Sequence, residues 1–269
     1  MFVRIGIDLG GTKIEAIALD DKGNVTWGRR VPTPRTYEGC LEAIHDLVLE
    51  SESAIGASAS VGVGIPGTIS PVTGLVKNAN STWLIGHPLD KALSERLSRP
   101  VRVTNDANCF ALSEAVDGAG AGAGVVFGVI IGTGVGGGIV VDGKVLEGPQ
   151  KIAGEWGHTP LPTPTDDERP GPECYCGRRG CIETFLSGPG LERDFLGASG
   201  RKLTSRDIAR LAEEGDSECV AALDRYVERL GRALAVVINI VDPGVVVLGG
   251  GLSNLPDLAE RAEKAIVPH

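Results

Sequence analysis

Residues 2–19 read FVRIGIDLGGTKIEAIAL, two apolar segments separated by the polar turn Asp8-Leu-Gly-Gly-Thr-Lys13. The segments 2–9 and 14–19 are short and rich in Ile, Val and Leu, which is typical of buried strands. A dinucleotide-binding loop would need a helix directly after the glycines, and a P-loop would need a different spacing. The segment therefore predicts a β-hairpin with a glycine turn.

The same plan recurs about 120 residues later. A strand-like segment at 125–131 is followed by Gly-Thr-Gly-Val-Gly-Gly-Gly at 132–138, which we interpret as a second glycine turn. A short strand at 139–141 then precedes Asp142-Gly143, a typical hairpin turn. Two halves with one order of elements predict a duplicated α/β domain with a cleft between the halves.

A connector of alternating glycine and alanine at 118–124 separates the halves. We therefore predict an N-terminal domain over residues 1–117 and a C-terminal domain over residues 118–269. Apolar spacing predicts the remaining elements. They are strands at 25–31, 60–65, 101–104 and 245–248, and helices near 37–53, 89–97, 106–116, 184–195, 205–214, 217–241 and 256–266.

The composition limits what the protein can bind. The net charge of −9 argues against a nucleic-acid surface, although a few backbone amides can still form a nucleotide site. The longest apolar segments are too short to span a bilayer and no signal peptide is recognisable, so we expect a cytoplasmic protein without membrane partners. Of the six cysteines, three lie in one short window, which favours a metal site in a reducing compartment over a disulfide framework.

That window contains Glu-Trp-Gly-His at 155–158 and Cys-Tyr-Cys-Gly-Arg-Arg-Gly-Cys-Ile-Glu at 174–183. One imidazole and three thiolates form a common closed set for structural zinc, which leaves no position for water. The alternative is a group of ordinary loop cysteines. The predicted zinc ligands are His158, Cys174, Cys176 and Cys181.

A carboxylate lies at each end of the window, Glu155 and Glu183. Sugar recognition needs fixed donors and acceptors for several hydroxyls, and a zinc-bound histidine can offer its second ring nitrogen. The two glutamates and His158 are therefore candidates for a sugar site. The alternative for either glutamate is a solvated surface acid.

The dipeptide Asn105-Asp106 lies where a predicted strand ends and a helix begins. Both residue types cap helices well, so capping alone would explain them. Phosphoryl transfer to an alcohol needs a carboxylate that accepts the hydroxyl proton, and an aspartate at the carboxyl end of a strand suits that role. Asn105 would then hydrogen-bond a neighbouring hydroxyl.

Both glycine turns offer backbone N–H groups that can approach phosphate oxygens. The alternative for each is a tight hairpin without a ligand. Gly249-Gly250-Gly251, after the last predicted strand, is a third such loop or a bare strand-to-helix turn. The candidate nucleotide residues are Gly10, Gly11, Thr12, Lys13, Gly132, Thr133, Gly134, Gly136, Gly137, Gly138, Gly249 and Gly250.

The complete set of motifs, in chain order, resembles the ROK family of sugar kinases, repressors and related open reading frames. The motifs are Asp-x-Gly-Gly-Thr-Lys, Asn-Asp-Ala-Asn, Gly-Thr-Gly-x-Gly-Gly-Gly, Glu-x-Gly-His and Cys-x-Cys-Gly-x-x-Gly-Cys-x-Glu. The resemblance runs from residue 1 to the end. It implies an actin-like, hexokinase-type fold of two ribonuclease-H-like domains. It also implies transfer of the γ-phosphoryl group of ATP to a hexose, with Mg²⁺ as cofactor, structural zinc and a homodimer.

Carried over residue by residue, the resemblance implies that Asp106 is the catalytic base and that Asp8 lies near Mg²⁺. It implies phosphate contacts at 10–13 and 132–138 and zinc ligation by the four residues named above. The implied sugar ligands are Asn105, Glu155, His158, Glu183, Gly67 and Asn80.

Within the family, Lys77-Asn-Ala-Asn-Ser-Thr-Trp83 looks most like the bacterial fructokinases that also accept mannose. Fructose is therefore the expected substrate, and mannose the second. The main alternative is an N-acetylglucosamine or N-acetylmannosamine kinase, with glucose behind it. A non-catalytic sugar-binding sensor, a polyphosphate-dependent kinase and a repressor are further alternatives, of which the repressor would need an N-terminal winged helix.

Relatives usually continue past the last helix into a short strand and a C-terminal helix that packs back on the first domain. This sequence stops at Val267-Pro-His269, so we expect that helix to be absent here. A real loss would affect domain coupling, stability and activity, although it removes none of the proposed chemical residues.

Overall fold

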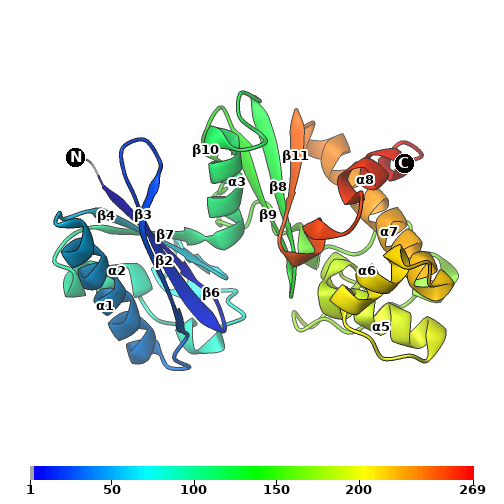
Figure 1. The fold of residues 1–269 in the computed structure, drawn as a ribbon, viewed down its shortest axis with the longest axis horizontal. Helices are drawn as coiled ribbons and strands as arrows, with labels where there is room; N and C mark the ends of the chain where they lie inside the picture. Colours follow the sequence, from blue (N-terminus) through cyan, green and yellow to red (C-terminus); the bar gives the residue numbers. More distant parts are fainter. Residues whose placement is uncertain (1–2) are drawn as a thin grey trace. The chain divides into compact units, whose positions relative to one another are not determined.

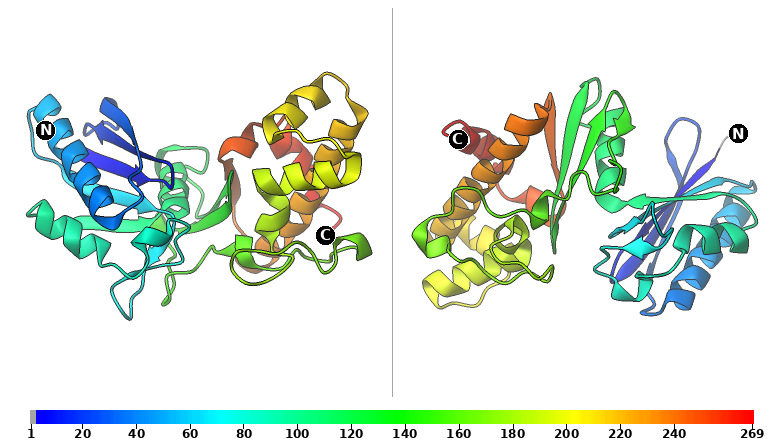
Figure 2. Two further views of the ribbon diagram at one scale, coloured as in Figure 1. Left: turned by 90° about the horizontal axis from the view of Figure 1, so that it is seen from below. Right: turned by 180° about the vertical axis from the view of Figure 1, so that it is seen from behind.

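The computed structural model describes residues 3–269, which form two compact units (Figures 1 and 2). Unit 1 contains the described residues up to Cys109 and the segment Glu147–Ile152. Unit 2 contains Phe110–Leu146 and Ala153–His269. The division after residue 117 stays a prediction, and the start of the first predicted strand, Phe2, lies outside the described residues.

Unit 1 is built on a five-stranded sheet in the order β3-β2-β1-β4-β7. β1 and β2 form the predicted antiparallel hairpin, whereas β1, β4 and β7 run parallel. Along β1, buried Ile5, Ile7 and Leu9 alternate with more exposed residues, as expected for a strand with one face in the core. The bounds are β1 (Arg4–Leu9), β2 (Lys13–Leu19), β3 (Val25–Pro32), β4 (Ser60–Ile65) and β7 (Val101–Asn105).

Two helices cover this sheet. In α1 (Tyr37–Ile55) the Thr36 hydroxyl caps the first turn by accepting the Gly39 N–H, and Gly56 ends the helix in the left-handed conformation. The helix contacts β1, β2 and β3, and α2 (Leu89–Arg96) contacts α1 and β7. Three short elements lie between β4 and α2 in the chain, namely β5 (Thr68–Ile69), β6 (Val76–Lys77) and the 3-10 helix η1 (Thr82–Leu84).

Unit 2 repeats the same strand plan. Its sheet has the order β10-β9-β8-β11, with β8 antiparallel to β9 and parallel to β11. In both units a hairpin is flanked by its third strand on one side and by a later parallel strand on the other, so the predicted duplication is confirmed. The bounds are β8 (Val125–Ile131), β9 (Val135–Val141), β10 (Lys144–Val145) and β11 (Val245–Gly249).

The helices of unit 2 pack around α7 (Ser217–Val241), which contacts α4, α5, α6 and α8. α3 (Asp106–Asp117) begins in unit 1 and continues into unit 2. The remaining helices are α4 (Ile182–Leu186), α5 (Gly188–Ser199), α6 (Ser205–Glu213) and α8 (Leu258–Ile266). The 3-10 helices are η2 (Trp156–His158), η3 (Asp166–Glu168) and η4 (Gly251–Asn254). No helix within residues 3–269 has both the length and the apolar content to cross a bilayer.

A buried ion network ties η3 to α7. The Glu168 carboxylate lies 2.7 Å from Arg229 Nε and 2.8 Å from Arg232 Nη2. Burial alone would raise the pKa of Glu168. The hydrogen bonds from Arg232 and Arg229 outweigh that effect and lower the pKa to about 2.

Two predicted elements differ from the structure. The glycine segment 132–138 is a turn only up to Gly134, because β9 begins at Val135 and includes the later glycines. The helix predicted near 184–195 is two helices that meet at Ser187. The Ser187 hydroxyl accepts the Gly190 N–H and starts α5, and Pro189 in its first turn has no N–H to donate back to α4.

Candidate functional site

In unit 1, the predicted catalytic residues lie at the carboxyl ends of parallel strands. Asp8 of β1 is opposite Gly64 of β4, and Ile65 of β4 is opposite Asn105 at the end of β7. A Cβ on Gly64 would lie 3.6 Å from the Asp106 Cα. Ligands of open α/β sheets bind at the carboxyl ends of strands, so this edge is where chemistry is expected.

The Asn105 and Asp106 side chains both cap α3. Asn105 Oδ1 accepts the N–H groups of Ala107 and Asn108 at 3.0 and 3.2 Å, and Asp106 Oδ1 accepts the Ala107 N–H at 2.8 Å. The capping alternative is therefore present in the structure. Capping uses one oxygen of each side chain and holds both groups in a fixed orientation at the strand–helix junction.

The Asp8 carboxylate lies in an environment that favours a cation. Its pKa is raised, first by desolvation and then by the negative charge of Glu15, while Lys13 and Arg30 act in the opposite direction. Glu15 is itself paired, with Arg30 Nη2 at 2.6 Å and Lys13 Nζ at 3.9 Å. A divalent cation would offset the desolvation, so the Asp8 carboxylate fits the role of an oxygen ligand that would hold Mg²⁺.

The first glycine turn is closed by its own backbone. Gly10 N–H donates to the Lys13 carbonyl at 3.0 Å, and a Cβ on Gly10 would lie 3.0 Å from that same oxygen. The turn itself therefore favours glycine at position 10. Thr12 and Lys13 are both exposed, which leaves a hydroxyl and an ammonium group at the tip.

The predicted sugar residues Gly67 and Asn80 lie beside this turn. A Cβ on Gly11 would lie 3.9 Å from Asn80 Oδ1, which is an ordinary contact. Gly67 has a φ of +146°, and a Cβ there would lie 2.8 Å from the Lys77 carbonyl and 3.0 Å from Ala79. The backbone at 77–79 therefore lies so close to residue 67 that only glycine fits there. Because Asn80 follows Ala79, Gly67 and Asn80 lie near each other.

In unit 2, the second glycine turn borders a cavity of about 640 Å³. Gly132 and Thr133 form one wall, and the Gly188 N–H donates to the Gly132 carbonyl at 2.7 Å, which ties the turn to the start of α5. The volume lies within the range of small-molecule sites, and a helix N-terminus favours an anion. The other lining residues are Gly188, Pro189, Glu192, Ser205, Arg206, Gly251, Leu252, Asn254 and Leu255.

Most of these lining residues were not identified from the sequence. They follow the glycine turn by long stretches of chain and belong to no motif. The predicted pair Gly249 and Gly250 does not line the cavity and has packing explanations. A Cβ on Gly249 would lie 2.5 Å from the Phe110 ring, and one on Gly250 would lie 2.5 Å from the Ile131 carbonyl.

Glu183 connects the second glycine turn to the cysteine-rich segment. Its Oε2 accepts the Val135 N–H at 3.0 Å, and a Cβ on Gly134 would lie 2.9 Å from the same oxygen. Glycine at 134 therefore admits the carboxylate. A residue predicted for the sugar thus lies against a turn predicted for phosphate.

The later glycines of β9 provide the surface on which η2 packs. Trp156 Nε1 donates to the Gly136 carbonyl at 2.9 Å, and its ring meets Phe127 edge to face, with centroids 5.5 Å apart. A Cβ on Gly137 would lie 2.9 Å from both rings. This packing holds η2 between Glu155 and the cysteine-rich segment. Gly154 packs closely on Gly138, because a Cβ on Gly154 would lie 3.3 Å from the Gly138 Cα.

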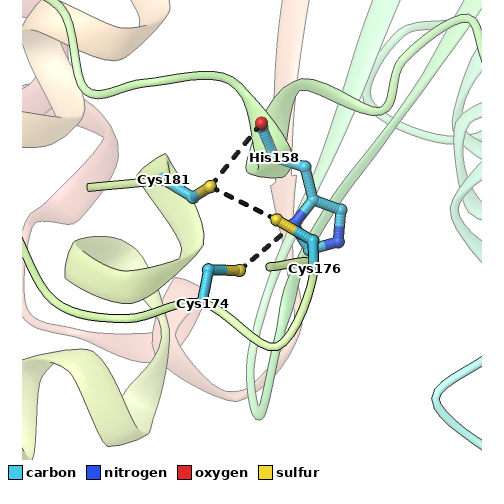
Figure 3. A group of neighbouring side chains, drawn as sticks. All are labelled: His158, Cys174, Cys176 and Cys181. Atoms are coloured by element: carbon cyan, nitrogen blue, oxygen red, sulfur yellow. Dashed lines mark hydrogen bonds between the residues drawn. The ribbon is translucent and has the colours of Figure 1, made fainter. Parts of the chain in front are cut away.

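The four predicted zinc ligands converge (Figure 3), and their ligand atoms all lie within 4.8 Å of one another. The Sγ atoms of Cys176 and Cys181 are 3.6 Å apart, and Cys174 Sγ is 3.5 Å from His158 Nδ1. Tetrahedral zinc with bonds of about 2.3 Å to sulfur and about 2.0 Å to nitrogen spaces its ligand atoms by roughly 3.5–3.8 Å. The donor set is therefore compatible with structural zinc.

Local turns hold the cysteines in place. Gly177 and Gly180 have φ angles of +87° and +67°, and the Gly177 N–H donates to the Cys174 carbonyl at 3.0 Å. Burial, followed by hydrogen bonds with Cys176 and Cys174, raises the pKa of Cys181 to about 12. A bound cation would be needed to favour its thiolate form.

The second ring nitrogen of His158 has a partner that was not identified from the sequence. Its Nε2 lies 2.9 Å from the Tyr175 hydroxyl, and the two rings meet edge to face with centroids 5.0 Å apart. Desolvation, followed by the negative charges of Glu183 and Glu155 among others, raises the pKa of Tyr175, so these carboxylates lie near it. Tyr175 occupies the unspecified position of Cys-x-Cys, which explains why the motif gave no signal.

Comparison with known proteins gives concordant matches. Residues 4–269 match the model of the ROK family. The N-acetyl-D-glucosamine kinase of Escherichia coli O1:K1 / APEC is 42% identical over 272 residues, which cover 98% of this chain and 90% of that protein. A ROK hexokinase structure from Thermus thermophilus has a TM-score of 0.84 and 33% identity, covering 99% of this chain and 88% of that chain. A ROK glucokinase from Streptomyces griseus, in complex with glucose and AMPPNP, has a TM-score of 0.81 and 30% identity, covering 98% and 88%.

These structures confirm the predicted α/β fold of the actin-like, hexokinase type. The fructokinase prediction is wrong, because the relatives similar over nearly the whole chain are N-acetyl-D-glucosamine kinases. That prediction depended on residues 77–83, a short segment that mixes exposed and buried positions. Ser81 is buried, and Trp83 Nε1 donates to Cys40 Sγ at 3.4 Å. The similarity across 98% of the chain outweighs the likeness of this one short segment.

Proposed function

We propose that this chain, which belongs to the ROK family, is an ATP-dependent kinase that phosphorylates the 6-hydroxyl of N-acetyl-D-glucosamine. One observation carries the proposal, namely the 42% identity with the Escherichia coli N-acetyl-D-glucosamine kinase across 98% of this chain. The similarity includes the glycine turns, the Asn-Asp dipeptide and the cysteine-rich segment. The proposal therefore rests on similarity across nearly the whole chain and not on one motif.

In unit 1, Asp106 is proposed as the catalytic base. Its carboxylate accepts the proton of the sugar 6-hydroxyl while that oxygen forms a bond to the γ-phosphorus. The bond between the γ-phosphorus and the bridging oxygen breaks, and ADP leaves with the electron pair. Asn105 Oδ1 caps α3, so we assign its contact with a neighbouring sugar hydroxyl to the Nδ2 donor.

In unit 2, Glu155, His158 and Glu183 are proposed to bind sugar hydroxyls. Glu183 is held by the Val135 N–H, and His158 is held by the cysteine cluster, so both side chains are oriented before the sugar arrives. Fixed polar groups discriminate well, because each group left unpaired by a wrong sugar costs about 1–3 kcal/mol. Zinc bound by the cluster supplies structural support rather than chemistry.

Each unit is proposed to contribute its own residues to nucleotide binding. The exposed Thr12 and Lys13 and the N–H groups of the first turn suit phosphate oxygens, and Asp8 suits Mg²⁺. In unit 2, the cavity of about 640 Å³ beside Gly132 and Thr133 has room for a nucleoside. Gly134, Gly137, Gly249 and Gly250 serve packing, so Gly132, Thr133 and Gly251 are the glycine-loop residues of unit 2 that we assign to the nucleotide.

The test is ATP-dependent phosphorylation of five sugars at matched concentrations with Mg²⁺: N-acetyl-D-glucosamine, N-acetyl-D-mannosamine, glucose, mannose and fructose. We expect the highest kcat/KM for N-acetyl-D-glucosamine. The 30% identity with the glucokinase from Streptomyces griseus makes glucose the second candidate. Preference for glucose would keep the kinase assignment and replace the sugar, whereas binding without any turnover would refute the kinase.

A further inference from the structure

The two ring nitrogens of His158 have different partners. Nδ1 lies 3.5 Å from Cys174 Sγ, and Nε2 lies 2.9 Å from the Tyr175 hydroxyl. Figure 3 shows one nitrogen directed at the cysteine sulfurs and the other pointing away from them. A neutral histidine that binds a metal through Nδ1 carries its proton on Nε2, so Nε2–H donates to the tyrosine oxygen. The acceptor at Nε2 therefore fixes both the tautomer and the orientation of the ring.

Tyr175 is placed so that it can leave. Its side chain is 68% exposed, although it follows Cys174, which is buried. The edge-to-face contact with His158 and the hydrogen bond to Nε2 hold the ring and the hydroxyl in this position. Moving the ring away would expose the Nε2–H while the cysteines stay in place, and water would solvate the freed hydroxyl.

The surroundings of Tyr175 are the residues proposed for the sugar. The charges of Glu183 and Glu155 both act on its hydroxyl, and His158 contacts it directly. We propose that the Tyr175 hydroxyl holds the Nε2–H of His158 in the sugar-free protein and is replaced there by a sugar hydroxyl on binding. Tyr175 is then a positioning residue for the metal ligand, and its displacement links sugar binding to the metal site. This inference rests on the proposed function.

The exchange predicts opposite effects of removing the hydroxyl. Without sugar, Tyr175→Phe leaves the His158 ring without a fixed acceptor, so the metal should be held less firmly. With sugar, the sugar hydroxyl supplies the acceptor, and the defect should disappear. The sugar no longer has to displace a protein hydroxyl, so its own affinity should rise.

The experiment uses the zinc-loaded full chain and its Tyr175→Phe variant. Zinc release to excess 4-(2-pyridylazo)resorcinol is followed by absorbance, with and without saturating N-acetyl-D-glucosamine, and sugar affinity is measured by calorimetry. We expect sugar-free release to be about tenfold faster in the variant, and the two proteins to release zinc at similar rates with sugar. We expect the sugar Kd of the variant to be about two- to tenfold lower, the contribution of one hydrogen bond.

The matched control is Tyr37→Phe, the same change at a unit 1 tyrosine whose buried hydroxyl has no hydrogen-bond partner among residues 3–269. It should alter neither quantity. Unchanged zinc release in Tyr175→Phe would overturn the positioning role, and a weakened sugar affinity would overturn the exchange by making Tyr175 a direct sugar ligand. Failure of the proposed function gives a different pattern, in which the wild-type protein binds none of the five sugars. The exchange would then fall with it, whereas faster sugar-free release would still support positioning.

Discussion

The two glycine hairpins share a sequence pattern and a topology, yet they use glycine for different reasons. In unit 1, a Cβ on Gly11 would meet Ser81 Oγ only at 3.5 Å, and the tip carries two exposed polar side chains. In unit 2, a Cβ on Gly134 or on Gly137 would lie 2.9 Å from a side chain of the protein itself. The tip of the first hairpin is open, whereas most of the second hairpin is a surface on which other segments pack.

This difference shows that the glycines of a duplicated motif need not meet the same surroundings. Both units share one strand plan. In unit 1, polar side chains lie at the ends of the strands, whereas in unit 2 the glycines of the second hairpin leave room for Trp156 and Glu183 to pack. A glycine is therefore best judged by what its missing Cβ would meet. The predictions below test this contrast between the open hairpin of unit 1 and the packed hairpin of unit 2.

The largest expected effect tests whether the strand ends of unit 1 carry chemistry rather than stability. In the native protein, Asp106 Oδ1 accepts the Ala107 N–H at 2.8 Å. The asparagine of Asp106→Asn keeps an oxygen that can accept this hydrogen bond, but its amide cannot act as a base. We expect kcat to fall by about 10²- to 10⁴-fold, with sugar affinity nearly unchanged. Steady-state kinetics and calorimetry check this. Asp117→Asn, at the exposed other end of α3, is the control, and undiminished turnover in Asp106→Asn would falsify the base assignment.

A pair of alanine substitutions tests the hairpins directly. Gly137→Ala places a methyl group 2.9 Å from Phe127 and Trp156, so we expect a loss of about 1–3 kcal/mol in the free energy of unfolding. Gly11→Ala should change that free energy by less than about 0.5 kcal/mol while raising the KM for ATP. Urea unfolding and kinetics give the two readouts. Equal stability losses would mean that both hairpins use glycine for packing.

Metal removal tests whether unit 2 depends on its cluster. Chelation should release His158 and loosen Glu183 in the adjoining helix α4, so we expect affinity for N-acetyl-D-glucosamine to fall at least about tenfold. Hydrogen exchange should show lost protection at residues 174–183 and unchanged protection in β1 and β2. Normal sugar binding by the metal-free protein would contradict the link between cluster and sugar.

The smallest effect concerns acid stability. The folded pKa of Glu168 is about 2, below its ordinary value of 4.5, so its pairing stabilises unit 2 above pH 4.5 and is lost as the pH falls towards 2. Lowering the pH from 7 to 4 should therefore cost less than about 1 kcal/mol through this group. Urea unfolding at several pH values measures it against Glu168→Gln, which should lack this part of the pH dependence. An identical profile in the variant would assign the acid sensitivity to other carboxylates.

Several features could be predicted from the sequence because they depend on local patterns. Apolar segments around glycines gave both hairpins, and the spacing of Cys174, Cys176 and Cys181 with His158 gave a cluster whose atoms converge. The substrate could not be predicted in this way. It was assigned from one segment, residues 77–83, in which exposed Asn78, Asn80 and Thr82 alternate with buried Ala79 and Ser81. Only some of its residue types can therefore report on a ligand.

Contacts between distant positions could not be predicted either. Nothing in the Cys-Tyr-Cys segment indicates that the tyrosine faces the histidine nitrogen that points away from the cysteines. Nothing in the glycine segment indicates which positions face Trp156 or the cavity. Glu168 looks like a surface acid until α7 brings Arg229 and Arg232 to it.

Residue chemistry and short-range periodicity thus predicted the strands, the turns, the duplication and the cluster of one histidine and three cysteines, because these depend mainly on neighbours along the chain. The partner of each side chain emerged only from packing. Close-packed interiors determine which atoms meet across long separations in sequence, and a one-dimensional pattern does not contain that information.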